Sequence, residues 1–110
     1  MGHDIYGYNK AGESIAYARF SMKNYNAYIL YDILKAQEYN GGVSGIGGSL
    51  TLSKKAMEKA WKDYEQLFSS ENDHFTEDKF LLWDKKQIRE FMINCLAEAK
   101  KEGRVVVFFG

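Results

Sequence analysis

A chain of 110 residues with 45% hydrophobic and 15% aromatic residues can bury one core without disulfides or a structural metal, so we expect a single globular domain over residues 1–110. Fifteen basic residues balance fifteen acidic ones, which argues against a nucleic acid held through its phosphates as the partner. No apolar run is long enough to span a bilayer, so a membrane is not expected as a partner either.

Residues 3–20 predict a β-hairpin, because β-prone residues flank a turn sequence at positions 9–13. A three-residue loop with Gly12 in the left-handed region would pair Asn9 with Glu13. This pairing fixes the register of the two strands.

In that register Ile5 lies opposite Tyr17 and His3 lies opposite Arg19. Since side chains alternate along a strand, the register also predicts the two faces of the hairpin. One face would carry His3, Ile5, Ile15, Tyr17 and Arg19. The other face would carry Tyr6, Tyr8, Ala16, Ala18 and Phe20.

A first helix is predicted from a cap at Asn24 or Asn26 to about Tyr39. Its apolar residues lie nearly all round the helix, which indicates the most buried helix of the fold; they are Tyr28, Ile29, Leu30, Tyr31, Ile33 and Leu34.

A second helix is predicted from an N-cap at Ser53, because apolar residues recur at helical spacing along one stripe. That stripe is formed by Met57, Ala60, Trp61, Tyr64, Leu67 and Phe68. The polar and acidic residues 69–76 predict a loop, and residues 77–83 predict a short helical or irregular segment.

A third helix is predicted after a capping box in which Asp84 is the N-cap and Gln87 reaches back to it. The apolar stripe that follows is formed by Ile88, Phe91, Met92, Cys95, Leu96 and Ala99. Cys95 is therefore interpreted as a core residue, because a thiolate would be costly there. Gly103 suits the left-handed residue that ends such a helix.

Residues 104–110 form a continuous β-prone apolar run, which is typical of a strand covered on both faces. This strand would complete the sheet begun by the hairpin. The predicted fold is therefore α+β. A small antiparallel sheet, made of the N-terminal hairpin and the C-terminal strand, packs against three or four helices in the order β-β-α-α-(α)-α-β.

Residues 40–49 hold five of the ten glycines within eight positions. Backbone N–H groups in a glycine-rich turn before a helix can hold an anion, and a second interpretation is a plain connection with tight backbone packing. The spacing matches neither the dinucleotide fingerprint nor a P-loop. The candidate ligand-binding residues are Gly42, Ser44, Gly45, Gly47, Gly48 and Ser49 of this loop, with Arg19 for charge and His3 and Tyr17 beside it.

No catalytic or metal-ligating motif is complete in the sequence, and no cofactor is expected. His74 stands among acidic residues at a spacing that fits neither zinc nor calcium sites. The single cysteine and the absence of a secretory signal favour a cytoplasmic location. The absence of proline and the abundance of lysine, asparagine, tyrosine and isoleucine favour an A+T-rich bacterial or phage genome.

Three functions remain open on these observations. The first is a non-enzymatic module that binds a small anionic ligand, of a nucleotide or phosphate-bearing type, through the glycine-rich loop. The second is a domain that binds or inhibits a protein partner, or forms a homodimer, through exposed aromatic residues or a strand edge. The third is a small enzyme that acts on a phosphorylated substrate.

Overall fold

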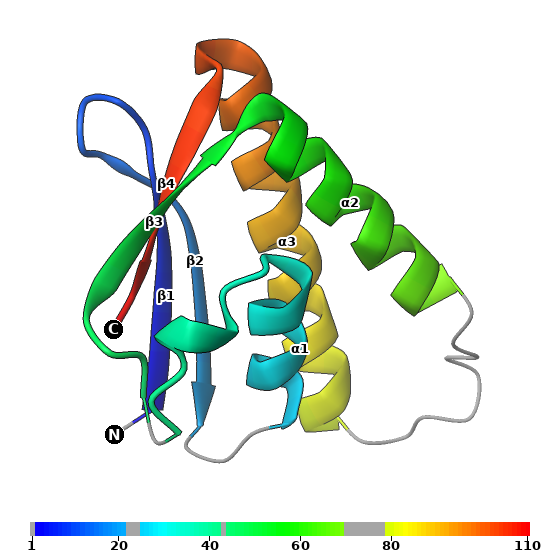
Figure 1. Ribbon diagram of the computed structural model, residues 1–110. Coiled ribbons are helices and arrows are strands. Elements are labelled where there is room, and N and C mark those ends of the chain that lie inside the picture. Colours follow the sequence, from blue (N-terminus) through cyan, green and yellow to red (C-terminus); the bar gives the residue numbers. More distant parts are fainter. Residues whose placement is uncertain (1, 22–24, 43, 70–78) are drawn as a thin grey trace.

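The computed structural model describes residues 2–21, 25–42, 44–69 and 79–110. In these residues four strands form one antiparallel sheet in the order β2-β1-β4-β3: β1 (Gly2–Tyr8), β2 (Ser14–Ser21), β3 (Gly48–Ser53) and β4 (Arg104–Phe109). Three helices, α1 (Tyr25–Ile33), α2 (Lys54–Ser69) and α3 (Lys79–Glu102), lie on one side of the sheet (Figure 1). The predicted α+β class is confirmed.

The core lies between the sheet and the helices, and strand periodicity decides which residues enter it. Every second residue of β1, β2 and β4 is buried, as expected when one face of a sheet packs and the other does not. α3 contributes the predicted stripe, in which Ile88, Phe91, Met92, Cys95 and Ala99 are buried and Leu96 is half-buried. Cys95 is therefore confirmed as a core residue.

The predicted turn of the hairpin is confirmed, but the predicted register is wrong. Gly12 has φ 81°, and the Asn9 N–H donates to the Glu13 carbonyl at 3.0 Å. Beyond the turn, Tyr8 pairs with Ser14 whereas Gly7 pairs with Ala16, so one extra residue is inserted in β2. Such a β-bulge shifts every later pair by one and exchanges the faces.

The observed pairs are therefore His3 with Phe20, Asp4 with Arg19, Ile5 with Ala18 and Tyr6 with Tyr17. His3 and Ile5 face the helices, together with Ala16, Ala18 and Phe20. Tyr17 and Arg19 lie on the opposite face, together with Tyr6 and Tyr8.

The helix boundaries differ from the predicted ones at two places. α1 ends at Ile33 and not near Tyr39, since Lys35 takes a left-handed conformation (φ 56°) and residues 37–39 form a separate 3-10 helix. α3 begins at Lys79, so Asp84 lies inside the helix and the capping box predicted there is wrong. The cap of α2 is confirmed, because the Ala56 N–H donates to Ser53 Oγ at 3.2 Å.

The glycine-rich loop leads into β3, a strand that the sequence analysis did not predict. β4 pairs with β1 on one side and with β3 on the other, so the C-terminal strand is an inner strand of the sheet. The prediction that it is covered on both faces is wrong. Its residues alternate between buried and partly exposed, because the helices cover only one face.

Candidate functional site

The face of the sheet that carries no helix, here called the open face, gathers aromatic side chains from several strands. Tyr6 and Tyr8 come from β1, Tyr17 comes from β2 and Phe108 comes from β4. Tyr17 is 46% exposed. Large apolar side chains gathered on an exposed face commonly mark an interaction site.

Tyr6 is the centre of this group. Its ring centroid lies 4.8 Å from that of Tyr17, 5.9 Å from that of Tyr8 and 6.4 Å from that of Phe108. These separations are typical of aromatic rings in contact. The four rings therefore support one another and form a continuous aromatic surface across β2, β1 and β4.

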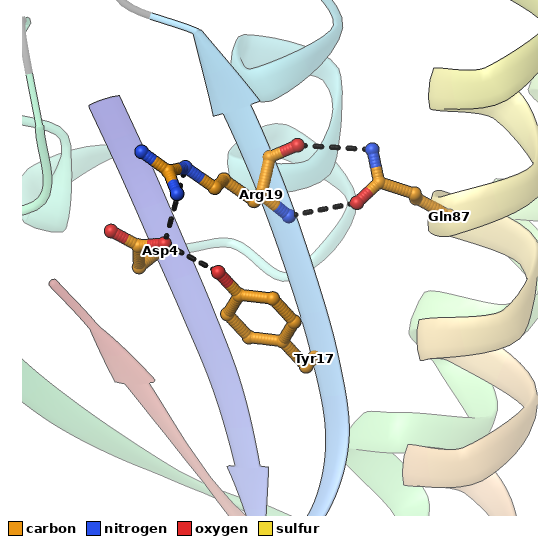
Figure 2. A network of polar contacts seen from close by, with 4 residues as sticks. All are labelled: Asp4, Tyr17, Arg19 and Gln87. Carbon is orange, nitrogen blue, oxygen red and sulfur yellow. Dashed lines mark hydrogen bonds and ion pairs between the residues drawn. The ribbon is translucent and has the colours of Figure 1, made fainter. Parts of the chain in front are cut away.

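A polar group lies beside the rings (Figure 2). The Tyr17 hydroxyl donates a hydrogen bond to Asp4 Oδ1 at 2.6 Å, and Arg19 Nε lies 3.7 Å from the same oxygen. The hydrogen bond to Asp4 raises the pKa of Tyr17 to about 12, with burial contributing less. Tyr17 thus stays protonated at neutral pH and its ring is held in one orientation.

Gln87 of α3 protects the edge of the sheet behind Arg19. The Arg19 N–H donates to Gln87 Oε1 at 3.0 Å, and Gln87 Nε2 donates to the Arg19 carbonyl at 3.0 Å (Figure 2). This side-chain amide occupies the two backbone groups that another strand would use. The edge of β2 is thereby closed at this residue.

In the described part of the glycine-rich loop, five backbone N–H groups bond within the protein. The Gly41 N–H donates to the Ser44 carbonyl, the Gly42 N–H to Asn40 Oδ1 and the Ile46 N–H to the Tyr39 carbonyl. The N–H groups of Gly45 and Gly47 donate to the carbonyls of Gly110 and Phe109, at 2.9 and 2.8 Å. An anion cradle needs free donors, and these five N–H groups are already occupied.

The close approach of the loop to β4 explains why Gly45 carries no side chain. A Cβ at that position would lie 2.5 Å from both the carbonyl carbon and the oxygen of Phe109. At Gly47 the reason is different, since its φ of 82° is one that other residues rarely adopt. These two glycines serve the attachment of the loop to the sheet, which agrees with the second interpretation of the sequence.

His3 connects this loop to the core. Its ring is fully buried, Nε2 donates to the Gly42 carbonyl at 3.2 Å and Nδ1 lies 3.0 Å from the Tyr31 hydroxyl. Because a carbonyl only accepts, Nε2 carries the proton and Nδ1 accepts from Tyr31. Burial lowers the pKa of His3 below its ordinary value of 6.5, so the ring is neutral at pH 7.

The predicted site residues therefore divide into two groups. The structure brings His3 to the loop, as expected, through its bond to Gly42. Tyr17 and Arg19 lie on the open face and contact Asp4 instead. Ser44 Oγ donates to the Gly45 carbonyl, and Ser49 belongs to β3 together with Gly48.

Tyr6, Tyr8 and Phe108 were not predicted to lie beside Tyr17. The cause is the bulge, because the predicted register assigned Tyr6 and Tyr8 to the face opposite Tyr17. For Phe108 the sequence offers no signal, because residues 105–109 are all apolar and only the structure shows that Val106 and Phe108 stand between buried residues.

A second polar cluster lies where α3 meets the hairpin turn. Glu98 is 8% exposed, and its Oε2 has no hydrogen-bond partner among the described residues. A hydrogen bond with Glu102, together with burial, raises the pKa of Glu98, while the same bond and the Lys10 N–H lower the pKa of Glu102. Of the two carboxyl groups, Glu98 therefore has the higher pKa and binds a proton more readily than Glu102.

Burial raises the pKa of the Cys95 thiol, so the thiolate is not available. Among the described residues no three His, Cys, Asp or Glu side chains are grouped to hold a metal ion.

A shallow groove of about 270 Å³ between α2 and α3 is lined by Glu58, Trp61, Lys62, Glu65, Leu96 and Lys100. His74 lies outside the described residues.

Comparisons with models of protein families, with curated proteins and with solved structures find no match for this chain. Across residues 2–21, 25–42, 44–69 and 79–110, none of the helices has both the length and the apolar character needed to cross a bilayer. The functional argument therefore depends on the geometry of the chain itself.

Proposed function

We propose that this domain is an interaction module that binds a protein partner on its open face. The observation that supports this proposal is the aromatic surface centred on Tyr6, whose ring contacts Tyr8, Tyr17 and Phe108. None of the three helices covers it (Figure 1). A folded domain gains little by placing four large rings on a face that it does not pack.

The chemistry of the open face fits a non-obligate protein interface. Tyrosine and arginine are enriched among residues that dominate binding energy, because they offer a large contact area together with hydrogen bonds. Here Tyr17 is held by Asp4, and Arg19 stands beside it at the rim. Rings already fixed in position lose less conformational entropy when a partner binds.

A protein is favoured over a nucleic acid as the occupant. Exposed aromatic rings on a sheet can also stack on bases, but that mode depends on a positively charged surface that follows the phosphates. The chain has no net charge at pH 7. On the open face the charge of Arg19 is paired with that of Asp4.

The test is affinity capture of partners from cell extract, followed by measurement of the affinity of each purified partner. Replacing Tyr17 with alanine should weaken binding at least about tenfold, as truncation of a central interface tyrosine does. Ile93→Ala is the matched control, because Ile93 is 42% exposed and lies on α3, on the helical side of the molecule. This control should bind as the unchanged protein does.

Three other outcomes would contradict the proposal. Binding that is lost in Ile93→Ala and kept in Tyr17→Ala would place the interface on the helices. Capture that disappears on nuclease treatment would show a nucleic acid to be the partner. A rise in melting temperature with a nucleotide or inorganic phosphate, unaffected by Tyr17→Ala, would restore the small-anion function expected from the glycine-rich loop.

A further inference from the structure

The two edge strands of the sheet, β2 and β3, differ in how far their outward backbone groups are protected from pairing with another strand. At the β2 edge, Gln87 occupies the N–H and the carbonyl of Arg19, and a bulge interrupts the strand. Proteins use such devices to prevent another strand from pairing at an edge. The β3 edge has neither a proline nor a charged residue within Gly48–Ser53.

Backbone geometry identifies the groups that β3 leaves available. Asp4 and Gly110 exchange both backbone hydrogen bonds, at 3.2 and 2.8 Å. Bonding direction alternates along a strand, so Phe108 also bonds toward β1, whereas Val105 and Val107 bond toward β3. Their partners in β3 are Leu52 and Leu50.

Ser49 and Thr51 alternate with Leu50 and Leu52 along β3. Their backbone N–H and carbonyl groups must therefore point away from β4. The Tyr39 hydroxyl donates to the Ser49 carbonyl at 3.2 Å, which agrees with this direction. Thr51 lies opposite Val106, which bonds toward β1, and among the described residues no hydrogen bond outside the strand ladders involves the N–H or the carbonyl of Thr51. Ser49 and Thr51 are both exposed. The Tyr39 hydroxyl occupies the carbonyl of Ser49, so the available groups at this edge are the N–H of Ser49 and both backbone groups of Thr51.

Positive charge gathers at one end of this edge. Lys54 and Lys55 follow Ser53 directly, and Arg104 is the pairing partner of Ser53. All three side chains are exposed, and none forms a salt bridge with a residue that the structure describes. The other end of the edge, residues 44–49, carries no charge, and Ile46 is 61% exposed there.

We infer that the β3 edge accepts an extended segment of a partner protein as a fifth strand, with acidic residues of that segment beside Lys54, Lys55 and Arg104. Backbone pairing would supply affinity, and the charges would select the segment and its direction. The inference is independent of the open-face proposal, because it depends on backbone groups of β3 and not on the aromatic rings.

Charge also argues against a second copy of this chain as the occupant. An antiparallel pair of β3 strands centred on Thr51 would place Lys54 of one copy beside residues 44–49 of the other. Those residues are uncharged, so the cations would find no carboxylate there. A heterologous acidic segment satisfies them, and a second copy becomes an outcome of the test.

The probes are two capped peptides of alternating valine and threonine, one with a pair of aspartates at its amino end and one with lysines at the same positions. Amide chemical shifts and hydrogen exchange of the protein report the contact. The aspartate peptide should shift and protect the amides of Ser49 and Thr51, and should bind at least about tenfold more tightly than the lysine peptide, with a difference that shrinks as salt rises.

Two kinds of variant test the mechanism. Thr51→Pro removes the outward N–H without touching the ladder to β4 and should abolish binding of the aspartate peptide. Lys54→Glu/Lys55→Glu should reverse the preference between the peptides. This double variant should fold even where Thr51→Pro does not, because both lysines are exposed, so it tests the inference by itself. Lys59→Glu/Lys62→Glu, further along α2, is the matched control and should keep the preference.

Three results would overturn the inference. They are no saturable binding at millimolar peptide, amide shifts confined to the open face, and self-association by sedimentation that Thr51→Pro removes. Tyr17→Ala should leave peptide binding unchanged, so failure here and failure of the open-face proposal are distinguished.

Discussion

The imidazole of His3 lies 3.0 Å from the hydroxyl of Tyr31, and both side chains are buried. This contact attaches β1 to α1. The other ring nitrogen of His3, Nε2, donates to the carbonyl of Gly42. A residue near the start of the chain thus connects the core to the glycine-rich loop, which itself bonds to the end of β4.

His3→Leu should destabilise the fold, because it leaves the buried Tyr31 hydroxyl and the half-buried Gly42 carbonyl without partners. Each unsatisfied polar group costs about 1–3 kcal/mol, so we expect a loss of about 2–4 kcal/mol in the free energy of unfolding by denaturant titration. Tyr31→Phe removes the hydroxyl itself and should cost less. Equal stability of His3→Leu and the unchanged protein would show that these bonds are dispensable.

His3 should also make stability depend on pH. Its folded pKa is lowered by burial, so above pH of about 6.5 the ring is neutral in both the folded and the unfolded state. As pH falls below that value the unfolded state binds the proton first, and stability is lost until the lowered folded pKa is passed. The measurement is the melting temperature between pH 7 and pH 5 for two variants that both carry His74→Gln. The variant that keeps His3 should lose more stability over this range than the variant that also carries His3→Gln.

Glu98 should act in the opposite direction. Its folded pKa is raised by the hydrogen bond with Glu102, so the folded state binds the proton more tightly, and stability falls as pH rises through that raised value. Glu98→Gln keeps a donor toward Glu102 without a titrating group. The variant should therefore gain stability relative to the unchanged protein at pH 8 and lose that advantage near pH 4. A constant difference across this range would show that the pKa of Glu98 is the same in the folded and the unfolded state.

Glycine is needed at positions 45 and 12 for two different reasons, a close backbone contact at Gly45 and a positive φ at Gly12. A Cβ at Gly45 would contact backbone atoms of Phe109 at 2.5 Å, whereas a Cβ at Gly12 meets open space but φ is 81°. Gly45→Ala should cost about 1–3 kcal/mol through overpacking, and Gly12→Ala about 1 kcal/mol through backbone strain. Gly45→Val, which would add more atoms at the same place, should destabilise further. A smaller loss for Gly45→Ala than for Gly12→Ala would mean that the loop moves away from β4 at little cost.

Local patterns in the sequence determined several parts of this fold. Turn chemistry predicted the hairpin loop at Gly12, and the cap at Ser53 predicted the start of α2, because both depend on residues within a few positions. The apolar stripe of α3 was visible for the same reason. The α+β class followed from the hairpin, the helices and the apolar run at residues 104–109.

Only the tertiary structure decided which side chains share each face of the hairpin. The bulge in β2 exchanges the faces by inserting one residue, and nothing in the local sequence required it. β3 was hidden for a related reason, since the serines and glycine of residues 48–53 become a strand through pairing with β4. Strand pairing joins residues far apart in the chain, so its register, its edges and the open face with Tyr6 and Tyr17 together emerge only when the sheet is assembled.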